Sequence, residues 1–281
     1  MQTQQLNVSP LAESHGAETL AFLAERPLDN VIMAGFIRDN GVVSAQNRGR
    51  FYGCRDASGA LEGVALVGRN ITFDARSEAA TAAFARLTRR QSPGSCLLMG
   101  ESEQVRRFWH YYAPGGDAPS RLREAFLLEQ RRPFGGCEEI GGLRPATSAQ
   151  LEEVAALHSE MIGEETGSEP LDTDREGFLR RCLRRIEQRR TWVWFDEGGR
   201  IIYKAEVVAL TPEAAYVEGV YVNPRERRKG YGRRCLAQMG RQLLGQAGAV
   251  CLFVDEGNRR AQDFYASVGY ASASRYRILY F

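Results

Sequence analysis

The fold of this chain is indicated first by one segment, Val217–Arg234, with the sequence V-E-G-V-Y-V-N-P-R-E-R-R-K-G-Y-G-R-R. An apolar strand ends at Val222, because Pro224 has no N–H group with which to continue a ladder. The loop that follows opens a helix, and its Gly230 and Gly232 put no Cβ between the backbone N–H groups and a ligand. Those amides, the helix N-terminus and the neighbouring cations together predict a site for an anion such as pyrophosphate.

A strand, a glycine loop and a helix are a weak signal by themselves, because a tight structural turn also explains them. The segment has neither the G-K-[ST] of a Walker loop nor the third glycine of the dinucleotide fingerprint. A second segment makes the signal specific. Gly257–Tyr270, with the sequence G-N-R-R-A-Q-D-F-Y-A-S-V-G-Y, sets Asn258, Ala261 and Tyr265 at helical spacing on one face.

Hydrophobic periodicity predicts the elements around these two segments. They are helices 149–162 and 172–190, strands 191–195, 200–210 and 216–222, helix 230–246, strand 250–254, helix 258–268 and strand 275–281. A meander of strands followed by a βαβ unit predicts an α+β fold, with a mixed, mostly antiparallel sheet flanked by helices.

The two motifs, R-x-x-G-x-G at Arg227–Gly232 and N-x-x-A-x-x-F-Y-x-x-x-G-Y at Asn258–Tyr270, resemble those of the GNAT superfamily of acetyl-CoA-dependent N-acetyltransferases. The resemblance covers Gly142–Phe281 and implies that a strand edge pairs with the pantetheine arm of acetyl-CoA and that a helix N-terminus seats its pyrophosphate. Lys229 stands where many members carry Arg or Gly, which keeps the charge. The cofactor-binding residues that the resemblance implies are Val220, Tyr221, Val222, Arg227, Arg228, Lys229, Gly230, Tyr231, Gly232, Arg233, Asn258 and Ala261.

The chemistry of such a transfer asks for a base and an acid. A primary amine has an unperturbed pKa of about 10.4, so a base must take its proton before it attacks the thioester. Glu218 is the candidate base, beside Gly219, which suits a bulge that would splay the sheet. The resemblance places Tyr265 beside the thioester sulfur, where it would donate a proton to the departing thiolate, although a packing role is the alternative.

Three further carboxylates are candidates for contacts with a cationic substrate. Glu206 lies on the neighbouring strand and is the second candidate base, and Glu164 and Glu165 follow the first helix of the second half. A solvated surface carboxylate is the alternative for each of them. A groove lined by these residues and Glu218 would favour a cationic amine.

The first half repeats a similar order of elements without the motif: strands 51–56, 61–68 and 70–74, helix 77–90, strand 96–100, helix 103–112 and strand 123–130. Arg69–Glu78, where a pyrophosphate loop would lie, contains no Gly. The order resembles bacterial tandem GNAT proteins, and we interpret residues 1–135 as a degenerate GNAT-like domain without a cofactor loop. The Pro- and Gly-rich run Arg131–Gly142 predicts the junction, with residues 136–281 as the catalytic domain.

The composition sets limits on the function. The chain has 281 residues, of which 43% are hydrophobic and 26% charged, and a formal net charge of only +2, which argues against general binding to nucleic acid. Six cysteines and three histidines are scattered singly, so no metal site or disulfide framework is indicated. The longest uncharged stretch, Gln242–Val254, is too short to span a membrane, and a cytoplasmic protein is expected. The oligomeric state is left open.

Three functions compete at this point. The first is an N-acetyltransferase (EC 2.3.1.-) that moves the acetyl group of acetyl-CoA to an amine of a small molecule or a protein. The second is a non-catalytic acyl-CoA-binding module that reports metabolite levels to a partner. The third is aminoacyl transfer from charged tRNA, against which the intact R-x-x-G-x-G loop argues because that donor has no CoA pyrophosphate.

Overall fold

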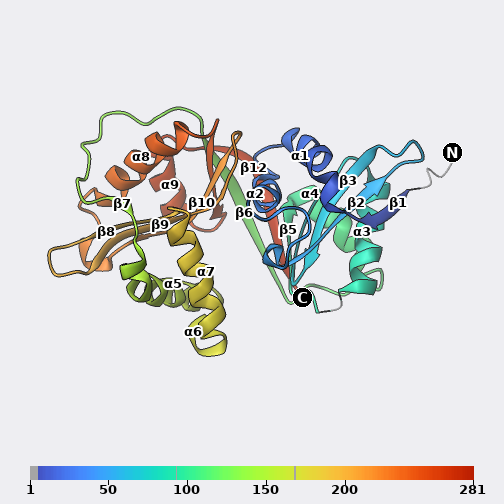
Figure 1. Cartoon of the computed structure of the whole chain (residues 1–281), viewed down its shortest axis with the longest axis horizontal. Coiled ribbons are helices and arrows are strands. Elements are labelled where there is room, and N and C mark those ends of the chain that lie inside the picture. Colours follow the sequence, from blue (N-terminus) through green and yellow to red (C-terminus); the bar gives the residue numbers. More distant parts are fainter. Residues whose placement is uncertain (1–5, 93, 168) are drawn as a thin grey trace.

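The computed structural model describes residues 6–92, 94–167 and 169–281, with the side chains in those ranges except those of Glu165 and Thr166. Figure 1 shows helices on a long, twisted sheet. The strands are β1 (Asn7–Pro10), β2 (Gly49–Arg55), β3 (Leu61–Gly68), β4 (Asn70–Ala75), β5 (Leu97–Glu101), β6 (Arg121–Gln130), β7 (Arg144–Pro145), β8 (Thr191–Phe195), β9 (Ile201–Leu210), β10 (Ala215–Val222), β11 (Val250–Asp255) and β12 (Ala271–Tyr280). The helices are α1 (Gly16–Ala24), α2 (Val31–Asn40), α3 (Glu78–Gln91), α4 (Ser102–Tyr112), α5 (Leu151–Thr166), α6 (Pro170–Thr173), α7 (Arg175–Glu187), α8 (Tyr231–Leu244) and α9 (Arg259–Ala266).

The described strands form one sheet in the order β1-β2-β3-β4-β5-β12-β6-β11-β10-β9-β8-β7. Its neighbours are antiparallel except for the two parallel pairs β4–β5 and β10–β11. The order β2-β3-β4-α3-β5-α4-β6 of the first half is repeated by β8-β9-β10-α8-β11-α9-β12 in the second. This repeat confirms the predicted mixed sheet with two similar halves in tandem.

The two halves exchange their last strands. β6, from the first half, pairs with β11 of the second, and β12, from the end of the chain, pairs with β5 of the first. The two exchanged strands also pair with each other along most of their length. The predicted boundary after residue 135 therefore assigns β6 and its neighbour β11 to different halves. The two halves share one continuous sheet.

Helices cover both faces of each half. α8 packs Leu236 and Met239 against the β9–β11 face that carries Tyr203 and Val217. α5 and α7 cover the opposite face of β8 and β9. In the first half α3 and α4 lie on one face, and α1 and α2 lie on the other. Successive side chains of a strand point to opposite faces of the sheet, and here the side chains on both faces are apolar. This is the pattern of strands that are buried on both sides.

Helix α2 belongs to the first half but also contacts the second. Its Gly35 lies so close to β9 that a Cβ there would come within 2.5 Å of the Ala209 Cβ. At its end, Asp39 accepts a hydrogen bond from Arg190, 2.8 Å away, which follows α7. This close approach ties the loop after α2 to the helix pair α5–α7.

The predicted strands and helices are confirmed, with ends shifted by a few residues. The main differences lie at α5, which extends to Thr166, and at α7, which begins at Arg175 after the short α6. Helices α1 and α2 were not predicted. The segment between Gln130 and Arg144 holds neither helix nor strand. None of the described helices combines the length and the apolar character that a membrane crossing requires.

Candidate functional site

The sheet opens between β10 and β11. These strands pair in parallel over only two residues of β10, Ala215 and Tyr216. The register against β9 then shifts around Gly219, whose φ of +61° is one that glycine adopts readily. The predicted bulge is therefore present. Val220, Tyr221 and Val222 lie beyond this two-residue pairing with β11, so their backbone can accept an extended ligand.

Helix α8 begins directly after the glycine loop. Its N-cap is Gly230, which has a φ of +80° and provides no side-chain cap. Arg228 is also left-handed, with a φ of +66°. The N–H groups at Tyr231 and Gly232, in the first turn, therefore have no cap side chain as acceptor and carry the positive end of the helix dipole. This geometry suits an anion.

The cations of the loop are exposed but partly engaged. Arg227 donates from Nε to the carbonyl of Val222 at 3.0 Å, and the Lys229 ammonium lies 2.7 Å from the Glu226 carboxylate. Arg233, in the first turn of α8, is exposed. The loop thus offers surface charge close to the helix N-terminus.

Helix α9 brings the second motif to the same place. Asn258 caps this helix, since its Oδ1 accepts from the Ala261 N–H at 3.0 Å, which leaves its amide N–H groups as donors. Ala261 and Tyr265 pack with Val220 and Val222 against one hydrophobic cluster. Burial raises the pKa of Tyr265 to about 12, so its phenol is protonated at neutral pH, as a proton donor must be.

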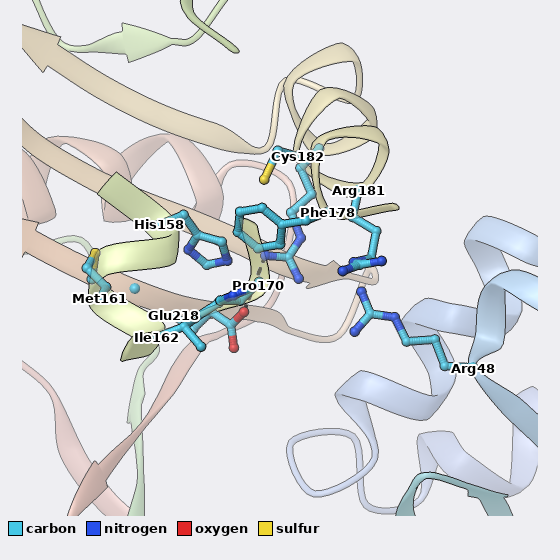
Figure 2. Close-up of a pocket in the computed structure, with 11 residues that line it drawn as sticks. Arg48, His158, Met161, Ile162, Pro170, Phe178, Arg181, Cys182 and Glu218 are labelled. Carbon is cyan, nitrogen blue, oxygen red and sulfur yellow. Dashed lines mark hydrogen bonds and ion pairs between the residues drawn. The ribbon is translucent and has the colours of Figure 1, made fainter. Parts of the chain in front are cut away.

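A pocket of about 330 Å³ lies where β10 leaves β11, between α5, α6, α7 and the loop before β2 (Figure 2). Glu218 and Gly219 line it, so it adjoins the open strand edge. Its apolar lining is Met161, Ile162, Pro170, Phe178 and Cys182, and its other polar lining is Arg48, His158, Arg181 and Arg185.

Glu218 is partly exposed in this pocket. One of its oxygens lies 3.3 Å from Arg185 Nη1, and Tyr216 donates its hydroxyl to the other at 3.5 Å. The predicted base is therefore positioned by two neighbours beside open space.

A buried ionic cluster lies beside the pocket on β9. Lys204 is 0% and Glu206 1% exposed, and their charged atoms are 2.8 Å apart. Arg185 binds the second Glu206 oxygen. Burial would raise the pKa of Glu206, but Lys204 and Arg185 hold it well below its usual range. The missing Cβ of Gly219, whose ideal position is 3.3 Å from Lys204 Nζ, leaves room for the ammonium.

His158 connects the cluster to the pocket. Its Nδ1 lies 3.1 Å from Lys204 Nζ, and its ring stacks on Phe178 with the centroids 5.5 Å apart. Burial lowers the pKa of His158 to about 4, so the ring is neutral at pH 7. A neutral ring that accepts from the Lys204 ammonium at Nδ1 carries its proton at Nε2. His158 is therefore a donor at this site and not a general base.

Of the expected substrate carboxylates, neither Glu206 nor Glu164 lines the pocket. Glu206 is buried and engaged by cations, which leaves it no surface for a substrate, so the expected contact is corrected to a buried ion pair. Glu164 lies exposed in the last turn of α5, outside the pocket lining, and the Glu165 side chain lies outside the described residues. The expectation of a groove rich in carboxylates is wrong for this pocket, where guanidinium groups outnumber them.

Five polar residues of the site were not predicted: Arg48, His158, Arg181, Arg185 and Lys204. Lys204 carried a signal, since it and Glu206 place two charges on one face of the apolar strand I-I-Y-K-A-E-V-V. Arg48 carried none, because its position depends on how the first half packs.

The corresponding place in the first half is closed. The Ala75 N–H, on the edge of β4, donates to Gln104 Oε1 of α4 at 3.2 Å, and Gln104 Nε2 donates to Asp74 at 3.2 Å. The N-terminus of α3 is capped by Ser77, whose hydroxyl accepts from the Ala80 N–H. In the first half, side chains of Gln104 and Ser77 thus bind the backbone N–H groups whose counterparts in the second half have no side-chain partner among the described residues.

Comparison with known proteins agrees with this geometry. Residues 153–270 match the model of the acetyltransferase (GNAT) family. A search of curated protein sequences found no match. Similar solved structures include a Drosophila protein (TM-score 0.70, 15% identity, 98% of both chains) and a GNAT-family acetyltransferase from Colwellia psychrerythraea (0.62, 15%, 99% of both chains). A tandem GNAT protein from the clavulanic acid biosynthesis pathway is also similar (0.61, 14%, 98% of both chains). At such identities the likeness to these structures concerns the fold.

Proposed function

We propose that this chain, in which residues 153–270 form a GNAT acetyltransferase domain, transfers the acetyl group of acetyl-CoA to an amine by direct attack on the thioester. The observation that carries the proposal is the edge of β10 at Val220–Val222, beyond its short pairing with β11, next to the N-terminus of α8, which has no side-chain cap. The strand edge supplies backbone groups for an amide-bearing arm, and the helix N-terminus supplies N–H groups for a pyrophosphate.

The residues present fit such a ligand. A Cβ built on Gly230 meets no atom within 4 Å, so the loop leaves space outside the helix. Asn258 has amide donors to spare, and Arg228 and Arg233 add exposed positive charge. Bound acetyl-CoA would supply an acetyl group activated as a thioester.

The chain's own residues then divide the proton transfers. Glu218 would accept a proton from the amine, directly or through water, since it lies at the junction of the open edge and the pocket. Tyr265 would donate its phenolic proton to the leaving sulfur, since its phenol is protonated at neutral pH, and would then regain a proton from solvent. A stoichiometry of one CoA per chain follows from the closed edge of β4 in the first half.

A second candidate is a non-catalytic acyl-CoA-binding module. The observation in its favour is the ion pair of Glu218 with Arg185, because a carboxylate held by a guanidinium is a weaker base. Release of free thiol from acetyl-CoA in the presence of amines separates the two, since the module would bind acetyl-CoA without turnover.

The cofactor assignment is tested by titration calorimetry with CoA. Gly232 is a poor position for the test, because its Cβ would come within 2.9 Å of the Val222 side chain and disturb packing in any case. Gly230→Val is better, and Gly199→Val in the β8–β9 turn is its matched control. Both glycines have positive φ, +80° and +77°, and open space around the Cβ position, so backbone strain is similar.

We expect one CoA per chain for the wild type and for Gly199→Val, and an affinity at least about 10-fold weaker for Gly230→Val. Equal CoA affinity in both folded variants would contradict the assignment of the loop. Two CoA molecules per chain would contradict the interpretation of the first half.

A further inference from the structure

The polar lining of the pocket has an excess of positive charge. Three guanidinium groups, those of Arg48, Arg181 and Arg185, face one carboxylate, Glu218, and a neutral His158. Arg185 is neutralised by its carboxylate partners, whereas Arg181 has an exposed partner outside the lining, Asp174. The Arg48 guanidinium makes no hydrogen bond or salt bridge within the described part of the chain, and only its backbone N–H donates, to the Ala45 carbonyl at 3.2 Å.

Arg48 is held in place by its own loop. Its φ of +57° is one that residues with a Cβ adopt rarely, so the surroundings must fix it. The preceding Asn47 is fully buried and donates to the carbonyls of Gly41 and Val42 at 3.0 and 3.2 Å. Asn47 also accepts from the Asn40 side chain at the end of α2. The loop is thus fastened to α2, and through it to α7.

The positively charged groups of Arg48 and Arg181 lie close together in this pocket. In Figure 2 the guanidinium groups of Arg48 and Arg181 point toward one another across the pocket. Desolvation, together with the charges of Arg185 and Arg181, lowers the pKa of Arg48, and only Glu218 opposes this. Arg48 is solvent-exposed, so water screens part of this repulsion, and an anion bound between the guanidinium groups would remove the rest.

We propose that the acetyl acceptor is a small amine that also carries a carboxylate or a phosphate-type anion, which binds to Arg48 and Arg181 while the amino group faces Glu218. Guanidinium groups match both kinds of anion through paired N–H donors. His158 adds a further N–H donor at Nε2. This inference rests on the proposed acetyl transfer and names the acceptor class for it.

The size of the pocket favours a small molecule. Its volume of about 330 Å³ is at the lower end of the range for ligand sites, and one side is apolar. The anion and the amine must be joined by a short carbon chain, because Arg48, Arg181 and Glu218 line the same small pocket. The first half would thus contribute one acceptor-binding residue, Arg48, to a site that otherwise belongs to the second half.

The test measures thiol release from acetyl-CoA with matched acceptors: α- and ω-amino carboxylates, each beside its primary amide, and 2-aminoethylphosphonate beside ethanolamine. An amino amide has a less basic amine than the corresponding α-amino acid, so intrinsic reactivity favours the amide at neutral pH. Better turnover of the acids thus requires a site for the anion. Whether the carboxylates or the phosphonate turn over better identifies the source of the anion.

The variants are Arg48→Gln and Arg181→Gln, with Arg50→Gln as the control, since Arg50 is exposed on β2 and does not line the pocket. We expect both pocket variants to lower kcat/KM for the anionic acceptors about 10- to 100-fold and to leave the KM for acetyl-CoA unchanged. Turnover of the amides should change little, and the control should match the wild type.

The possible failures are distinguishable. Amides turned over as well as acids, with no effect of either pocket variant, would overturn this inference and leave acetyl transfer standing. No thiol release with any amine by a protein that binds acetyl-CoA would overturn the proposed function, and the acceptor class with it.

Discussion

The buried imidazole of His158 makes folding stability depend on pH in a defined window. Burial lowers the pKa of His158 to about 4 in the folded chain, whereas an exposed imidazole has an ordinary pKa of 6.5. On acidification the unfolded chain takes up this proton first. Stability contributed by the neutral ring is therefore complete above pH 6.5 and is lost as the pH falls toward 4.

The size of the effect follows from the same shift. The difference between the folded and unfolded pKa corresponds to about 3 kcal/mol in total, of which about 2 kcal/mol falls between pH 7 and about pH 4.5. The His158 side chain is only 14% exposed, so solvent reduces this free-energy difference only slightly. Glu206 contributes in the same direction, but its lowered pKa moves its share to more acidic solution.

Urea unfolding of the wild type and of His158→Gln, at pH 7 and at about pH 4.5, measures this pH-dependent part of the free energy of unfolding. Glutamine can still accept from Lys204, so the variant keeps that contact. We expect the loss of stability on acidification to be about 2 kcal/mol smaller in His158→Gln than in the wild type. His110→Gln, at an exposed position on α4, is the control and should behave as the wild type. The same pH dependence in all three proteins, or titration of His158 near pH 6.5 by NMR, would refute the reasoning.

Three further predictions concern the proposed chemistry and the shared sheet. Tyr265→Phe should lower kcat about 100-fold or more with little change in acetyl-CoA binding, because the ring still packs and only the proton donor is lost. An unchanged kcat would mean that Tyr265 only packs and donates no proton. Glu218→Gln should slow turnover and remove the acidic limb of the pH–rate profile, since an amide cannot take the amine's proton; persistence of that limb would exclude it as the base. A fragment of residues 136–281 should aggregate on expression, because β11 loses its β6 partner and β12 loses both neighbours; a soluble fragment with the activity of the full chain would contradict this.

The local features of the fold could be predicted from the sequence. The bulge at Gly219 and the loop at Gly230 depend on backbone preferences that a glycine expresses on its own. The Asn258 cap depends only on the three residues that follow it. Such features are encoded within a few residues, so a pattern in the sequence is sufficient to find them.

The features that the sequence did not predict depend on distant contacts. Arg48 reaches the pocket only because α2 packs on β9 through Gly35 and Ala209, residues far apart in the chain. The role of Glu206 was misjudged for the same reason: a carboxylate on a strand looks like a surface group until Arg185, from another element, is placed beside it. An ion pair between residues more than twenty positions apart, such as Arg185 and Glu206, produces no periodic pattern in the sequence.

The strand exchange has a consequence for the open edge on which the proposed function rests. β10 leaves β11 after Tyr216, and a strand that loses one neighbour is held by the other alone. β11 keeps its position because β6 pairs with it along its whole length, with Val250 opposite Gln130 and Asp255 opposite Ala125. The first half thus contributes the strand that lets the sheet open without coming apart, as well as the arginine that faces Glu218. An isolated second half would carry every residue of the two motifs, Arg227–Gly232 and Asn258–Tyr270, and still lack the support for the gap between β10 and β11.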